Sequence, residues 1–173
     1  ADHSINALLG NEQIFNEGRS LGAENRQFPV DNFAIYDLSL GSLPQKPASS
    51  YQQDGLVSFF GRLFYGYKDK YLITGSLRAD GSSKFAGQNR FGYFPSVSAA
   101  WRIDRESFMS AISVINELKL RASYGKAGNN RIGNNRYSSI FSTGWYTNGP
   151  LEIPTLVPTV LANPDLKWET ITS

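Results

Sequence analysis

The sequence predicts an all-β protein built from antiparallel strands. Several segments alternate apolar and polar residues with a period of two, which is the spacing of side chains on the two faces of a strand. Phe, Tyr and Trp make up 13% of the 173 residues and there are 16 glycines, a composition that favours pleated sheets over helices. The connections between these segments alternate between short and long, as they do where strands run up and down beside one another.

The first 50 residues contain one predicted strand and one long loop. Ile5–Leu9 is expected to form the strand, and residues 11–50 are expected to form the loop, with a short helix near Asn11–Glu17. The chain starts without Met or a signal peptide and stops where a strand begins. Both ends are therefore expected to be cut from a longer protein.

The central part of the chain contains three alternating segments. Leu56–Tyr67 and Tyr71–Asp80 are predicted strands, joined by the tight charged turn Lys68–Lys70. A loop at 81–91, rich in Gly, Ser and Asn, leads to a third strand of this group, Pro95–Ile103. These three strands should pair in sequence order.

The last third of the chain combines two strands with a helical link and a long loop. The link, Asp104–Asn116, is predicted to contain a short helix that Asp104 caps and that carries Phe108, Met109 and Ile112. Leu118–Gly125 is the clearest strand of all. Residues 126–164 are rich in Asn, Gly and Pro and are expected to be a long loop, after which a sixth strand begins at Leu166.

The two faces of the predicted strands differ in polarity. Alternation places four arginines on the same face as Ser and Thr side chains: Arg62, Arg78, Arg102 and Arg121. The opposite face carries Leu63, Leu77, Val97 and Leu120. A charged face is costly against a dry core, but natural if it lines a wet lumen while the apolar face meets lipid. A soluble antiparallel sheet with one solvated face alternates in the same way, so the pattern alone leaves both architectures open.

Composition argues against several classes of function. A net charge of +2, from 17 basic and 15 acidic residues, gives no electrostatic reason to expect a nucleic-acid partner. The absence of Cys and the single His3 leave no thiolate site, histidine metal site or catalytic dyad. The carboxylates are scattered, and no apolar run reaches the roughly 20 residues of a membrane helix. We expect neither an enzyme nor a metal or cofactor site.

The stretch Asp80-Gly81-Ser82-Ser83 invites comparison with ion-binding loops. It lacks the alternating acidic ligands of a calcium loop and the Gly-Lys-Ser/Thr element of a phosphate loop. Asp and Ser bond to local backbone at turns, where Gly supplies unusual dihedral angles. We interpret this stretch as the turn at the end of a strand.

Four motifs resemble the SusC/RagA family of TonB-linked outer-membrane receptors. Residues 70–85 (KYLITGSLRADGSSKF) are similar to the family's KYLLTASLRADGSSRF, and residues 92–102 match GYFPSVSAAWR. Residues 118–125 match LKLRASYG, followed by Gly128-Asn129 as in the family, and residues 163–169 match NPDLKWE. Four motifs in the family's order, with plausible spacing, make the resemblance specific between residues 51 and 128 and again between 161 and 171.

The resemblance implies a fold and a function. It implies an antiparallel up-and-down membrane β-barrel of about 22 strands with a plugged lumen, of which this chain supplies about six. The plug domain and the closing C-terminal strand would lie outside residues 1–173. It also implies import of glycans, oligosaccharides or peptides through the outer membrane of a Bacteroidota-type Gram-negative bacterium. The partners would be membrane lipid, a SusD-like surface lipoprotein and TonB, the last two through parts outside this chain.

The resemblance and the pattern together assign provisional roles. Arg62, Arg78, Arg102 and Arg121 are expected to face the lumen, and the tyrosines near the Lys68–Lys70 turn to form an interfacial girdle. Exposed aromatic and basic residues on the long loop are candidates for substrate contact: Tyr137, Trp145, Tyr146 and Arg131.

Two rival interpretations remain open at the level of sequence. One is a complete soluble β-rich module that binds carbohydrate through the same loop aromatics. The other is a small complete membrane barrel of about eight strands, although only about six are counted here.

Overall fold

The computed structural model describes residues 2–29, 37–110 and 114–173, and the chain divides into two units. The first unit comprises residues 1–14 and 55–173, and the second comprises residues 15–54. Two strands, β1 (His3–Gly22) and β4 (Ala48–Tyr67), contribute to both units. No described helix is long and apolar enough to cross a membrane.

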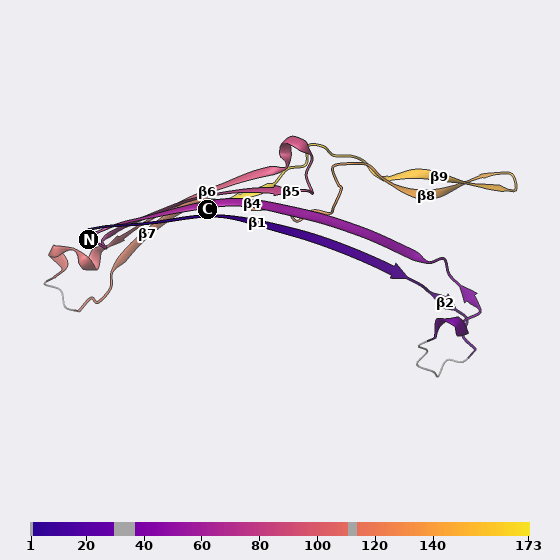
Figure 1. The fold of residues 1–173 in the computed structure, drawn as a ribbon, viewed down its shortest axis with the longest axis horizontal. Coiled ribbons are helices and arrows are strands. Elements are labelled where there is room, and N and C mark those ends of the chain that lie inside the picture. The colour runs from indigo at the N-terminus through magenta and orange to yellow at the C-terminus, as the bar shows by residue number, and fades with distance from the viewer. Residues whose placement is uncertain (1, 30–36, 111–113) are drawn as a thin grey trace. The chain divides into compact units, whose positions relative to one another are not determined.

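A six-stranded sheet dominates the fold, and its long strands are labelled in Figure 1. The strand order is β1-β4-β5-β6-β7-β10. The members after β4 are β5 (Tyr71–Ser82), β6 (Phe91–Arg102), β7 (Lys119–Asn129) and β10 (Glu169–Thr172). The pairs β4–β5, β5–β6, β6–β7 and β7–β10 are antiparallel. All six predicted strands are therefore present, and the three in the centre pair in sequence order.

The second unit is small and held together by local polar contacts. Strand β2 (Asn25–Arg26) pairs with β3 (Leu43–Pro44), and a short 3₁₀ turn spans Leu38–Leu40. The Asn25 Nδ2 group donates to the carbonyl oxygens of Leu38 and Gly41, each at 2.8 Å. One amide side chain thus ties the 3₁₀ turn to the two-stranded ribbon.

The prediction for residues 11–50 was wrong at both ends. Strand β1 continues to Gly22, so Asn11–Glu17 is strand and not helix, and residues 48–50 already belong to β4. Polar side chains on both faces hide the alternation in this extension. Cross-strand contacts stabilise it instead, including Asn16 to Asp54 at 3.0 Å and Ser20 to Ser50 at 2.7 Å.

The long loop predicted at 126–164 contains regular structure. Strand β7 extends to Asn129, and β8 (Ile140–Asn148) and β9 (Leu151–Val160) form a separate antiparallel hairpin. Pro154 and Pro158 concealed β9, because proline is rare within sheets. In a two-stranded ribbon every strand is an edge, so proline is tolerated there.

The short helix predicted within Asp104–Asn116 is replaced by two 3₁₀ turns, Ile103–Arg105 and Ser107–Met109. Asp104 does not cap a helix, because its carboxylate accepts a bond from the Arg102 guanidinium at 3.1 Å. The backbone N–H groups of Ile103 and Asp104 both donate to the Leu118 carbonyl, which pins the segment to the start of β7. Ile112 lies outside the described residues.

Strand register places the four arginines on one face of the sheet. Directly opposed residues share a face, and Arg62 is opposite Ser76, which is opposite Ser96. By the same register, Arg78 is opposite Phe94, Arg121 opposite Ala100, and Arg102 opposite Lys119. We call this the polar face.

The opposite face is apolar and exposed. Leu63, Leu77, Val97 and Leu120 lie on it, and the solvent-accessible fraction of each is between 50% and 60%. Leu9 of β1 contacts Gly61 on the same face and is 87% exposed. Isolated exposed leucines are ordinary, but a continuous apolar sheet surface needs a covering medium or partner.

The described residues bury a small aromatic core at the end of the sheet away from the Lys68–Lys70 turn. Phe85 is fully buried and Phe94 is 7% exposed, and the ring centroid of Trp168 lies 5.3 Å from each of theirs. The Trp168 Nε1 group donates to the Arg90 carbonyl at 3.0 Å. Three of the four recognised sequence motifs thus meet in one cluster.

Candidate functional site

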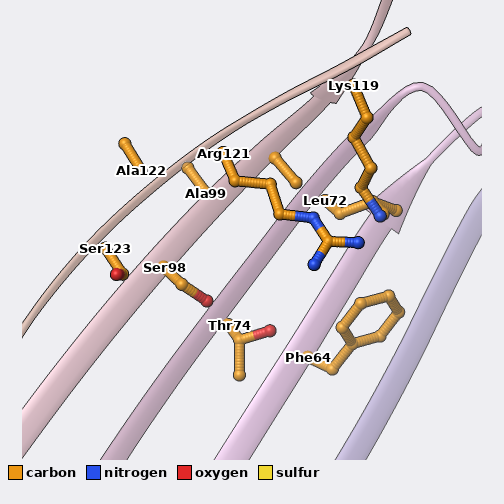
Figure 2. Close-up of a pocket in the computed structure, with 10 residues that line it drawn as sticks. Phe64, Leu72, Thr74, Ser98, Ala99, Lys119, Arg121, Ala122 and Ser123 are labelled. Carbon is orange, nitrogen blue, oxygen red and sulfur yellow. The ribbon is translucent and has the colours of Figure 1, made fainter.

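The polar face contains a hollow of about 420 Å³ between β4 and β7 (Figure 2). Phe64 and Leu72 supply its apolar part, and Thr74, Ser98 and Ser123 supply hydroxyl groups. Lys119 and Arg121 extend from β7 over the neighbouring strands in the direction of Leu72, as Figure 2 shows. The hollow exists because small side chains occupy the central strands while long cations project from β7.

A second hollow of about 450 Å³ continues the first toward the other end of the strands. It is lined by Arg62, Ser76 and Ser96, and it shares Thr74, Ser98 and Ser123 with the first. The Ser76 and Ser96 hydroxyls are 2.7 Å apart. The two hollows therefore form one hydroxyl-lined trough, to which small polar side chains at period two contribute from three strands.

Two of the four polar-face arginines have carboxylate partners. Arg78 contacts Glu12 at 2.9 Å and Asp80 at 2.7 Å, and its Nη2 also donates to the Ser58 hydroxyl at 2.9 Å. Arg102 contacts Asp104 at 3.1 Å. Both arginines are engaged in holding strands and turns together, so they are poor candidates for contact with a ligand.

The other two arginines stand without an acidic partner. Within the described part of the chain, no carboxylate forms an ion pair with Arg62, Arg121 or Lys119. The described residues that line the two hollows include no Asp or Glu. These three cations give the trough a positive potential, because no Asp or Glu among its described lining residues neutralises them.

A second polar cluster lies at the tight-turn end of the sheet. Glu106 accepts hydrogen bonds from the Lys70 ammonium at 2.9 Å, the Tyr71 hydroxyl at 2.8 Å and the Trp101 indole N–H at 3.0 Å. The bond from Lys70, followed by those from Trp101 and Tyr71, lowers the pKa of the Glu106 carboxyl from 4.5 to about 2. This carboxylate joins the turn, β5 and β6, and is therefore structural.

Aromatic side chains gather at the same end, on the apolar face. Tyr67 is opposite Tyr71, with ring centroids 6.4 Å apart, and Tyr71 is opposite Trp101. The His3 ring lies 4.9 Å from that of Tyr67, and its Nδ1 is 2.9 Å from the Tyr65 hydroxyl. The tyrosines predicted as a girdle thus form one band with His3 and Trp101.

The predicted loop candidates do not form a single platform. Trp145 and Tyr146 are neighbours in β8 and so point to opposite faces of the β8–β9 hairpin, although both are more than half exposed. Tyr137 is half-buried in the turn that precedes β8. Arg131 is exposed, and its backbone N–H donates to the Asn129 side chain at 3.0 Å.

The stretch Asp80–Ser83 forms the end of β5 and the turn that follows. Ser82 is buried, and its hydroxyl accepts bonds from the Lys84 backbone and the Asn130 amide, each at 3.3 Å. The Ser83 hydroxyl accepts from the Gly55 N–H at 2.9 Å. These side chains are used in local structure, and the described residues include no group of three potential metal ligands around them.

Sequence analysis did not name Lys119 or the individual hydroxyl residues of the trough as candidates. Alternation nevertheless places Ser and Thr side chains on the face of the arginines, and Lys119 has the same parity as Arg121 in β7, so the period-two pattern carried the signal for both. The sequence pattern does not predict that the trough walls lack carboxylates. Which residues line the trough depends on which strands pair, and no local pattern reports that pairing.

Comparison with known proteins identifies the family. The family described as TonB dependent receptor-like, beta-barrel matches residues 2–173. TonB-dependent receptor P3 of Formosa agariphila is 36% identical over 170 residues, which is 97% of this chain and 17% of that protein. TonB-dependent receptor SusC of Bacteroides thetaiotaomicron is 38% identical over 129 residues, 68% of this chain and 12% of that protein.

The fold agrees with a solved structure of the same kind. The structure of the RagAB peptide transporter superposes with a TM-score of 0.83 at 32% identity, covering 99% of this chain and 19% of that one. The chain thus spans less than a fifth of the length of each relative named here. It belongs to the TonB-dependent receptor-like β-barrel family, and its sequence and fold resemble part of SusC/RagA-type receptors.

Proposed function

We propose that this chain forms part of the barrel wall of a TonB-dependent importer. The polar face lines the lumen, and the apolar face contacts lipid. The observation that carries the proposal is the two-faced sheet itself. One face holds an uninterrupted exposed apolar surface, and the other holds a hydroxyl-lined, cationic trough. A transmembrane barrel requires this division, because lipid surrounds it and water fills its interior.

The proposal includes an orientation in the membrane. The Lys68–Lys70 turn and the Asp104–Asn116 connection face the periplasm, and the 81–91 loop and the β8–β9 hairpin face outward. The shortness of the Lys68–Lys70 turn supports this orientation, because outer-membrane barrels have short periplasmic turns and longer outer loops. The aromatic band of His3, Tyr65, Tyr67, Tyr71 and Trp101 supports placing this end of the sheet at an interface between lipid and water. These strands form about six of some 22 in the complete barrel, whose plug lies elsewhere in the receptor.

The proposed substrates are glycans, oligosaccharides or peptides. SusC and the RagAB peptide transporter are the relatives that support this range. A trough lined with Ser and Thr suits hydrated, hydroxyl-rich or amide-rich solutes, which exchange hydrogen bonds readily. The proposed partners are a SusD-like surface lipoprotein and TonB, which bind parts of the receptor outside this chain.

We assign first contact with substrate to the outward loops. Trp145 and Tyr146 present exposed rings on the β8–β9 hairpin, with Tyr137 and Arg131 in the segment that leads to it. Aromatic faces bury large area at little entropic cost and stack on sugar rings or peptide side chains. Arg62 and Arg121 would meet the substrate later, within the lumen.

Residues on opposite faces of adjacent strands allow a matched test of the lumen assignment. Ser98→Trp places a bulky ring in the trough, whereas Ile73→Phe enlarges a residue of the apolar face that lines neither hollow. The proposal predicts that, at equal receptor abundance in the outer membrane, Ser98→Trp strongly reduces TonB-dependent uptake of labelled oligosaccharides or peptides and Ile73→Phe does not. Equal uptake by both variants, or loss only in Ile73→Phe, would contradict it.

A further inference from the structure

Lys119 and Arg121 form a cationic pair with a defined surrounding. They are two residues apart on β7 and share the polar face. Both line the first hollow, where Thr74, Ser98 and Ser123 contribute hydroxyl groups and Phe64 and Leu72 contribute apolar surface. Figure 2 shows both side chains lying over the hollow and not turned away from it.

The charge state of this hollow differs from that of its surroundings. Arg78 and Arg102, on the same face, are each neutralised by a carboxylate of this chain. Lys119 and Arg121 have no such partner among the described residues, and no described acidic residue lines the hollow. A concave site with one sign of charge concentrates ions of the opposite sign.

The donors in the hollow match a carboxylate group. A guanidinium presents parallel N–H groups that fit the two oxygens of a carboxylate, and an ammonium adds a compact second charge. Hydroxyls of Thr74, Ser98 and Ser123 can donate to the same oxygens. The apolar surface of Phe64 and Leu72 suits the carbon skeleton that carries the carboxylate.

We propose that Lys119 and Arg121, with the hydroxyls around them, form a carboxylate-binding subsite, and that the substrate class is therefore acidic: oligosaccharides or peptides that carry carboxylates. This inference rests on the proposed function, because it requires the polar face to line the path of the substrate. Arg62, in the adjoining hollow, extends the positive surface along the same trough.

The test uses the full-length receptor purified in detergent and four probes. A uronic-acid oligosaccharide is compared with a neutral oligosaccharide of equal length, and an Asp-containing peptide with its Asn counterpart, both amidated at the C-terminus so that the Asn peptide has no carboxylate. Binding is measured by calorimetry for the wild type, Arg121→Gln and Lys119→Gln. Lys84→Gln is the control, because it removes one positive charge from the turn after β5, outside both hollows.

The inference predicts that an acidic probe binds the wild type more tightly than its neutral partner. Either Gln variant should weaken that binding about tenfold, the effect of losing one charge-assisted hydrogen bond, and leave the neutral probe unchanged. Lys84→Gln should change neither, and Arg121→Lys should restore part of the affinity. The acidic probe whose binding the Gln variants weaken shows whether the carboxylate belongs to a sugar or to a peptide.

Three results would overturn the inference. The first is that neither acidic probe binds the wild type better than its neutral partner. The second is that the Gln variants weaken acidic and neutral probes equally. The third is that they lower the thermal midpoint of the ligand-free receptor and abolish all binding, because a carboxylate of the receptor itself would then be the partner. Reduced uptake in Ser98→Trp would still support the proposed importer in each case.

Discussion

At the scale of single residues, Glu106 is the most connected side chain at the tight-turn end. Its two carboxylate oxygens receive bonds from Lys70, Tyr71 and Trp101, which come from the turn and from two neighbouring strands. A second ion pair, Arg105 to Asp69 at 3.3 Å, joins the same two connections on the surface. One half-buried carboxylate with three donors therefore fixes this end of the sheet more firmly than the exposed pair does.

Acidification should release this end of the sheet only at very low pH. The folded-state pKa of Glu106, about 2, lies below its ordinary value of 4.5, so its contribution to stability is complete above pH 4.5 and is lost as pH falls toward 2. We expect the fluorescence of Trp101, in a receptor with its other tryptophans replaced, to stay constant from pH 7 to 4.5 and then to change. Glu106→Gln should remove this transition, whereas a transition centred near pH 4.5 in the wild type would show that the three donors do not hold the carboxylate.

At the scale of elements, glycines allow the aromatic core to close over the sheet. The Phe94 ring lies against both Gly92 and Gly128, at positions where a Cβ atom would overlap it. The ring then packs against Trp168, which follows the β8–β9 hairpin in the chain. The strand β10, only four residues long, is thereby anchored beside β7 by a side chain immediately before it.

Adding a methyl group at Gly128 should therefore destabilise the sheet. Gly128→Ala places a Cβ against the Phe94 ring, and such overpacking costs about 1–3 kcal/mol. Gly75→Ala, on β5 and two strands away in the sheet, is the matched control, because a Cβ there meets nothing within 4 Å. Denaturant unfolding of the two variants in detergent measures the difference; equal midpoints would mean that the aromatic cluster does not stabilise the fold.

The two faces of the β8–β9 hairpin should contribute unequally to substrate binding. Trp145 is opposite Pro154 and Tyr146 is opposite Ile153, on opposite faces of the ribbon. A substrate that docks against one face contacts only one of the two rings. We expect one of Trp145→Ala and Tyr146→Ala to weaken binding about fivefold, or about 1 kcal/mol, and the other to have little effect. Equal losses in a titration of the purified receptor would show that substrate reaches both faces.

At the scale of the whole chain, period-two alternation predicted the strands but not all of their lengths. It located four strands of the sheet, β4 to β7, and placed Arg62, Arg78, Arg102 and Arg121 on one face. It failed where both faces of a strand are polar, as in the extension of β1, and where prolines lie in the β8–β9 ribbon. In these places cross-strand pairing outweighs local propensity.

The site was predictable only in part, for a related reason. Arg78 pairs with Glu12 and Trp168 packs on Phe85, contacts between residues 66 and 83 positions apart. No local pattern reports which strands become neighbours, so the sequence could not predict these two contacts. The neutralised arginines did carry a local signal, because Asp80 and Asp104 lie two residues after Arg78 and Arg102. Arg62 and Arg121 are followed at that spacing by Phe64 and Ser123, which carry no charge. The motif resemblance supplied the family, whereas the structure shows that Phe85, Phe94 and Trp168 of those motifs form one cluster.

The central claim is that one face of this sheet meets lipid and the other meets water. Cysteine scanning in intact outer membranes tests it directly, because the chain contains no cysteine of its own. Single cysteines at Leu63, Leu77, Val97 and Leu120 should react with lipid-soluble reagents and resist aqueous ones, while cysteines at Ser76, Ser96, Ser98 and Ser123 should show the reverse. Equal reactivity of the two sets toward aqueous reagents would contradict the assignment of the faces.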